Sequence, residues 1–299
     1  MIDILLKRSF DNGKTWQEMR VIAEGGVDTI DNPATVVDRK TGAIWLTFCK
    51  NNQQVFAIYT TDDGVTWSKP VEITQQVKDP AWHYVGSGPG HGIQLKSGRL
   101  LIPAWGDTSP GPVTWLPVMN WGKVQFSYCF YSDDHGASWK RGDALESNMS
   151  DECEVVETAD GRVYMNMRSR QGKHRRAYAW SKDGGVSWTK VKYDERLSES
   201  SCQGSVIRFT GQDRFGKNRV LLANPASDTD RSKLAVRISY DECQTWSVSK
   251  VVDEGSVAYS DLAIAPDMTI LCLYDANGYT KLVLARFNLA WLTNGTDHL

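Results

Sequence analysis

The sequence predicts an all-β protein built from repeated β-sheet units, and three observations support this class. An eight-residue pattern, Ser/Thr-x-Asp-x-Gly-x-Ser/Thr-Trp, recurs along the whole chain. Apolar runs of strand length stand between its copies. The copies follow one another at intervals of about 50 to 70 residues, the size of one blade of a β-propeller.

Each copy of this pattern, the Asp box, is interpreted as a hairpin turn with an aromatic anchor. In residues 181–188, Gly185 can take the positive φ of a tight turn, and Asp183 can accept hydrogen bonds from unpaired backbone N–H groups. Trp188 is expected to bury its indole between strand layers, which stabilises by roughly 1.5–3 kcal/mol. The copies end at Trp16, Trp67, Trp139, Trp188 and Trp246, and the last has Cys243 in place of glycine.

Strands are expected in groups that each lead into a box. Residues 3–8 lead into the first box, and the strands that would precede a box in a full blade are missing there. The segment 105–121 reads as a long excursion within the third unit. The predicted strands are 32–38, 42–49, 54–59, 88–95, 98–103, 123–131, 152–157, 161–168, 175–180, 202–209, 219–223, 234–238, 258–264, 269–274 and 281–287, with a short helix at 289–292.

Composition limits the function classes. The chain has 299 residues, of which 41% are hydrophobic, and a net charge of −2, so it carries no electrostatic footprint for nucleic acid or an anionic membrane. No apolar run approaches the length of a membrane span. The even spread of repeats favours one domain over residues 1–299. Six scattered cysteines without a Cys-x-x-Cys pair are interpreted as reduced core thiols.

Four residues stand out because each lies at or near the end of a predicted strand, where side chains of a propeller converge. They are Glu152, Arg168, Arg231 and Tyr259. A hairpin through residues 160–161 is expected to bring Glu152 and Arg168 back to the same end. Taken singly, the charged residues are better explained as surface ion pairs, and Tyr259 as a core residue. The hypothesis of a functional site therefore rests on the four residues in combination.

The chain resembles the sialidase (neuraminidase) superfamily, whose fold is a six-bladed β-propeller with Asp boxes. The resemblance rests on the five boxes, on segments 151–168, 231–239 and 258–262, and on Gly88-Pro-Gly-His-Gly-Ile-Gln-Leu95 and Cys202-Gln-Gly-Ser205. It implies that Tyr259 is the nucleophile and Glu152 its general base. It also implies that Arg168 and Arg231 are two of three arginines that hold the substrate carboxylate, without metal or organic cofactor.

These residue types suit a sugar that carries a carboxylate on its anomeric carbon. An anionic nucleophile would meet like charge, whereas a tyrosine is neutral until a base takes its proton. Guanidinium groups bind a carboxylate through paired N–H donors, which lysine does not offer. The function expected is therefore retaining hydrolysis of terminal sialic acid from glycoproteins, glycolipids or oligosaccharides by an exo-α-sialidase, a glycoside hydrolase with tyrosine chemistry.

The family pattern also contains an Arg-Ile-Pro segment and an acid/base aspartate ahead of the first box, and neither is in this sequence. The first blade is therefore expected to be incomplete, by roughly 30 residues. The sequence has no signal peptide at its start. A cytoplasmic location is therefore expected if the chain is complete, and secretion or a periplasmic location stays open if it is longer. The alternative functions are a catalytically silent sialic-acid or glycan-binding propeller, and a hydrolase of a related acidic sugar. For Trp82 and Tyr84 two interpretations stay open, which are stacking against a bound sugar and packing within the protein.

Overall fold

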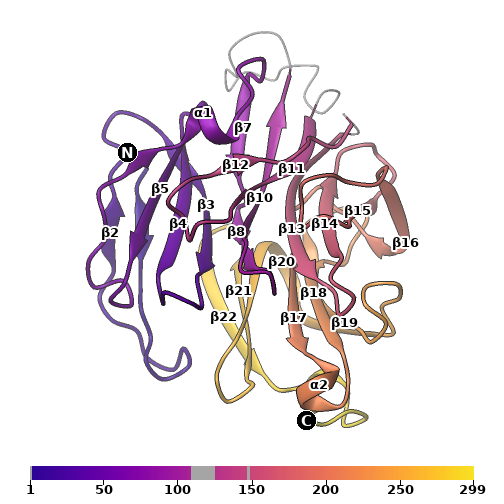
Figure 1. Ribbon diagram of the computed structural model, residues 1–299. Helices are drawn as coiled ribbons and strands as arrows, with labels where there is room; N and C mark the ends of the chain where they lie inside the picture. The colour runs from indigo at the N-terminus through magenta and orange to yellow at the C-terminus, as the bar shows by residue number, and fades with distance from the viewer. Residues whose placement is uncertain (1, 109–124, 147–148) are drawn as a thin grey trace. The chain divides into compact units, whose positions relative to one another are not determined.

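The computed structural model describes residues 2–108, 125–146 and 149–299 (Figure 1). The chain divides into two compact units. The first runs to Cys153 and includes Trp180–Val191, and the second contains Glu154–Ala179 and Lys192–Leu299. Strands β13 (Ser150–Glu157) and β15 (Arg175–Ser181) each have residues in both units. A single domain over residues 1–299 stays a prediction.

The first unit contains three groups of strands, which pair antiparallel except for β8. The strand pair β1-β2 stands first, the sheet β6-β5-β4-β3-β8 follows with β8 parallel to β3, and the third sheet is β12-β11-β10-β7 with β9 on β10. The bounds are β1 Ile4–Leu6, β2 Arg20–Ala23, β3 Ile30–Val37, β4 Ile44–Lys50, β5 Gln54–Thr60, β6 Val71–Glu72, α1 Thr74–Val77, β7 Tyr84–Ser87, β8 Gly90–His91, β9 Ile93–Gln94, β10 Leu100–Asp107, β11 Gln125–Ser132 and β12 Lys140–Arg141.

The second unit holds most of the sheet β13-β14-β15-β16 and all of the sheet β17-β18-β19-β20-β21-β22. Its further bounds are β14 Val163–Ser169, β16 Lys192–Ser198, β17 Ser205–Thr210, α2 Gln212–Phe215, β18 Arg219–Pro225, β19 Ser232–Ser239, β20 Val248–Ile264, β21 Ile270–Ala276, β22 Lys281–Phe287 and α3 Leu289–Leu292. The helix at 289–292 is thus confirmed. The elements that were not predicted are α1, α2, β2, β6, β7, β12 and β16.

The predicted count of six blades is not what the sheets display. The described residues form five sheets, of which the first is only the pair β1-β2 and four have at least four strands. The last two predicted groups merge because β20 continues for 17 residues. Its first part pairs with β19 and its second part pairs with β21, so one strand joins what the sequence pattern divided into two blades.

The Asp boxes have the predicted local geometry. In the second box, Thr60 Oγ1 accepts from Gly64 N–H at 2.9 Å, and Asp62 Oδ1 accepts from Thr66 N–H at 2.9 Å. Gly64 has φ +78, and the corresponding Cys243 of the last box adopts φ +66. The aspartate therefore closes each turn from within, as its place in the pattern predicted.

Burial of the box tryptophans is uneven. Trp139 and Trp246 are 4% and 9% exposed, but Trp16 is 45% exposed, which contradicts the expectation that every copy anchors a buried indole. The first box lies between β1 and β2, which form a sheet of only two strands, so less apolar surface is available to cover Trp16.

Apolar side chains close the core of each unit. All eight residues of β10 are buried, as expected for a central strand covered on both faces. The six cysteines are buried thiols that form no disulfide, as predicted. The predicted excursion at 105–121 lies largely outside the described residues. Among the described residues, no helix combines the length and the apolar character that a membrane crossing needs.

Candidate functional site

Three of the four predicted site residues meet in the second unit. Arg168 lies on β14, Tyr259 within β20, and Arg231 directly before β19. Arg168 Nη1 donates to the Tyr259 hydroxyl at 3.2 Å, and the Arg231 guanidinium carbon lies 5.6 Å from the centroid of the same ring. Two guanidinium groups therefore border one phenol, although the two arginines are far apart in the chain.

A break in strand register positions Tyr259. On β20, Val257 pairs with Ala276 and Ser260 pairs with Tyr274, so two residues lie between the paired positions on β20 and one on β21. Such β-bulges redirect a side chain and are frequent beside active sites. Tyr259 is one of the two residues that lie within this irregularity of β20.

Arg231 is held from two sides. Its Nη1 donates to the Tyr279 hydroxyl at 2.8 Å, and its Nη2 donates to the Ser201 carbonyl at 2.5 Å. Tyr279 lies in the turn between β21 and β22, is 62% exposed and has φ +66. A non-glycine residue in this region is strained, and such strain tends to collect at functional sites.

Asp275 on β21 adds a carboxylate beside this group. Burial raises its pKa above the ordinary value, while a hydrogen bond from the backbone N–H of Tyr259 and the positive charge of Arg231 act in the opposite direction. The cluster thus contains two guanidinium groups, a phenol and one half-buried carboxylate. The arrangement favours an anionic ligand or a phenolate, because both arginines keep their charge at neutral pH.

Glu152 lies in the first unit, on β13, and is 5% exposed. Its backbone N–H donates to the Asp151 carboxylate at 2.8 Å, and the Asp151 carbonyl accepts from Ser127 Oγ at 2.6 Å. These contacts fix the strand from which Glu152 projects. Its approach to the three residues of the second unit stays a prediction.

Sequence reasoning missed several polar residues that the fold gathers. In the first unit, Asp31 accepts from the side-chain amides of Asn32 and Asn52 at 3.0 Å, and burial raises its pKa against those hydrogen bonds. The available signal for Asp31 was a carboxylate at the second position of β3, directly after the apolar Ile30. For Asp275 and Tyr279 the signal was weaker, because each follows an ordinary strand or turn pattern.

The choice left open for Trp82 is decided in favour of packing. Its ring lies 4.7 Å from the Phe126 ring and 4.8 Å from the Tyr128 ring, within the apolar core of the first unit. Tyr84 is 8% exposed, and its ring centroid lies 4.3 Å from that of Trp105.

Comparison with known proteins gives the family. A family model described as a BNR repeat-like domain matches residues 1–272. The chain belongs to this family. Its relatives include a sialidase of Micromonospora viridifaciens, 34% identical over 97% of this chain and 47% of that protein. A sialidase of Bacteroides fragilis (strain YCH46) is 32% identical over 92% of the chain and 54% of the relative. The chain therefore spans about half the length of these two relatives.

Among solved structures, the Hadza microbial sialidase Hz136 is similar with a TM-score of 0.85 and 28% identity, over 97% of this chain and 60% of that chain. This likeness confirms the all-β propeller fold predicted from the box repeats. Together with the family match, it places the chain in the sialidase superfamily of Asp-box propellers.

Proposed function

We propose that this protein is a retaining exo-α-sialidase that releases terminal sialic acid from glycoconjugates. The observation that carries the proposal is the contact of Arg168 Nη1 with the Tyr259 hydroxyl, with the Arg231 guanidinium beside the same ring. A neutral nucleophile flanked by two cationic groups matches a substrate whose reacting carbon bears a carboxylate. The sialidase relatives support the same substrate class.

In the proposed reaction, Tyr259 Oη forms a bond to the anomeric carbon while the bond to the leaving oxygen breaks. Glu152 takes the phenol proton, and the leaving oxygen takes a proton from solvent. Water then attacks the same carbon and breaks its bond to the tyrosine oxygen. The tyrosine recovers its proton from Glu152, and the proton that the water loses goes to solvent. Two inversions in sequence leave the configuration of the released sugar unchanged.

Arg168 and Arg231 have two roles in this scheme. Before reaction, their N–H donors bind the substrate carboxylate with charge-assisted hydrogen bonds. During reaction, their positive charge favours the phenolate that attacks, which lowers the barrier to proton loss from a group with a free pKa near 10. The chemistry needs no metal or organic cofactor.

The test compares the protein with its Tyr259→Phe variant on an aryl α-sialoside, by release of the aryl group. Tyr274→Phe is the matched control, because Tyr274 is a buried tyrosine of the same unit whose hydroxyl donates to Asp253 at 3.0 Å. We expect Tyr259→Phe to abolish turnover and Tyr274→Phe to retain it.

The configuration of the first sugar released, followed by NMR, tests retention. Equal rates for Tyr259→Phe and the unmodified protein would remove the tyrosine from the mechanism. Binding of sialic acid without turnover would favour a silent glycan-binding propeller, and turnover confined to another acidic sugar would change the substrate assignment.

A further inference from the structure

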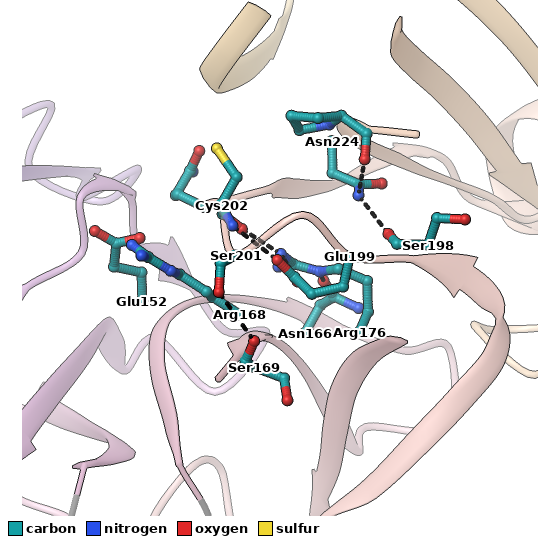
Figure 2. A network of polar contacts seen from close by, with 12 residues as sticks. Glu152, Asn166, Arg168, Ser169, Arg176, Ser198, Glu199, Ser201, Cys202 and Asn224 are labelled. Atoms are coloured by element: carbon teal, nitrogen blue, oxygen red, sulfur yellow. Dashed lines mark hydrogen bonds and ion pairs between the residues drawn. The ribbon is translucent and has the colours of Figure 1, made fainter. Parts of the chain in front are cut away.

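A loop after β16, residues 199–203, is held from within by a buried ion pair. Arg176 on β15 and Glu199 are 0% and 2% exposed, and Nη1 of the arginine lies 2.6 Å from Oε2 of the glutamate. Arg176 Nε also donates to the side-chain carbonyl of Asn166 on β14 at 2.8 Å. Figure 2 displays this network within the second unit.

The ion pair fixes both peptide groups of one loop residue. Cys202 N–H donates to Glu199 Oε1 at 2.7 Å, and the Cys202 carbonyl accepts from Arg176 Nη1 at 2.6 Å. Ser201, the residue before it, has φ +55. The pair thus closes a short turn and holds a non-glycine residue in a conformation that is unfavourable for an isolated chain.

The other side of the same loop contacts the candidate site. The Ser201 carbonyl accepts from Arg231 Nη2, and Gln203 Oε1 accepts from the backbone N–H of Ser260 at 3.0 Å. Ser260 follows Tyr259 directly in the chain. The loop therefore connects the buried ion pair to the guanidinium of Arg231 and to the strand that carries Tyr259.

Stability alone is a poor explanation for this network. Apolar residues of similar volume often replace a buried ion pair without loss of stability, so the burial of this pair is weak evidence for a purely stabilising role. A second arginine, Arg237, lies close by, and burial together with the charge of Arg176 lowers its pKa to about 10. Arg237 Nη1 donates to the side-chain carbonyl of Asn224, whose amide donates to the Ser198 carbonyl at 2.9 Å, next to Glu199.

We propose that Arg176 and Glu199 are positioning residues, which act through the 199–203 loop to hold Arg231 in the orientation that binds the substrate carboxylate. The inference rests on the function proposed above for Arg231. It assigns the pair to substrate affinity, because the loop contacts the Arg231 guanidinium directly, whereas its contact with Ser260 is made to the backbone.

Two variants separate positioning from stability. Glu199→Gln removes the charge and leaves Arg176 without its counter-ion. The double variant Arg176→Met/Glu199→Leu replaces the pair with apolar side chains of similar length, which is expected to restore much of the stability. The control is Asp297→Asn, because Asp297 forms a comparable buried pair with Arg219 at 2.6 Å in the same unit, with exposures of 5% and 1%.

The measurements are KM and kcat on an aryl α-sialoside, the Tm, and hydrogen exchange of the peptide containing Cys202. For Glu199→Gln and for the double variant we expect a rise in KM of roughly 10-fold or more, with kcat changed by less than about threefold. The Cys202 amide should exchange faster in both. Asp297→Asn should lower the Tm while KM and the Cys202 exchange stay unchanged.

Recovery of both Tm and KM in the double variant would assign the pair to stability and overturn the inference. A KM unchanged in Glu199→Gln would do the same. Absence of turnover in the unmodified protein would instead refute the proposed function. In that case hydrogen exchange decides the structural part, and Cys202 protection that survives Glu199→Gln would overturn it independently.

Discussion

Truncation of Trp139 tests the anchoring role of the box tryptophans. Trp139 is 4% exposed, and its ring packs edge-on against Trp45 at 6.0 Å and Phe130 at 5.6 Å between centroids. Trp139→Ala removes a buried indole and leaves a cavity that its aromatic neighbours fill only in part. We expect a loss of about 3–5 kcal/mol in the free energy of unfolding.

Trp16→Ala is the matched control within the same unit, because Trp16 occupies the same position of the first box. The turn hydrogen bonds of the two boxes are alike: Asp11 Oδ1 accepts from Thr15 N–H and Asp134 Oδ1 accepts from Ser138 N–H, each at 2.9 Å. Trp16 is 45% exposed, so its truncation removes much less buried surface. We expect a loss below about 2 kcal/mol.

Both variants are compared with the unmodified protein by urea unfolding, followed by far-UV circular dichroism because each substitution changes the tryptophan fluorescence. The m-value reports whether the surface exposed on unfolding is unchanged. Equal losses for the two variants would refute the argument that burial, rather than the turn itself, makes the tryptophan stabilising. A loss below about 1 kcal/mol for Trp139→Ala would refute it as well.

Three further predictions concern the site and the turns. Arg231→Lys replaces a planar donor that contacts two oxygens with a point charge, so KM for the aryl sialoside should rise by about 10-fold or more, measured from initial rates. Burial raises the pKa of Asp38 but four hydrogen bonds outweigh it, with a net fall from 3.8 to about 2. The carboxylate thus stabilises the fold above about pH 4 and loses this contribution as the pH falls toward 2. Asp38→Asn should therefore flatten the drop in urea midpoint between pH 6 and pH 3, and an unchanged drop would contradict this. Gly136→Ala places a methyl 2.1 Å from the Trp45 ring, whereas Gly161→Ala meets nothing within 4 Å, and both have positive φ. The free energy of unfolding, measured in urea, should fall by about 1–3 kcal/mol more in Gly136→Ala than in Gly161→Ala. Equal losses would show that backbone strain, and not the contact with Trp45, causes the whole effect.

Local hydrogen bonding explains why the box turns could be predicted. In each box the hydroxyl, the carboxylate and the backbone donors that they bind lie within eight residues, so the sequence contains every partner. The same holds for the helix at 289–292, where Asn288 accepts from the Trp291 N–H at 2.8 Å. Burial of Cys49, Cys129 and Cys272 was predictable for a similar reason, since each stands within an apolar run.

Long-range contacts limited the prediction of the site. Strand ends identified Arg168, Arg231 and Tyr259 as residues that could converge, and the resemblance to sialidases gave them roles. The pattern could not supply the bulge at Tyr259, because it depends on the register between β20 and β21. Asp275 and Tyr279 escaped notice for the same reason, since their contacts with Tyr259 and Arg231 arise from sheet pairing.

The sequence by itself determined the propeller class, the turns and the identity of the candidate residues, because repeats, turn residues and charged strand ends are local features. Only the tertiary structure decided how strands were shared between sheets, which tryptophans were buried and which polar groups met. The Arg168 to Tyr259 hydrogen bond joins residues 91 positions apart, and the Arg176 to Glu199 pair joins β15 to the residue that follows β16. Such contacts depend on register and on burial by distant strands, and neither is encoded in a short stretch of chain.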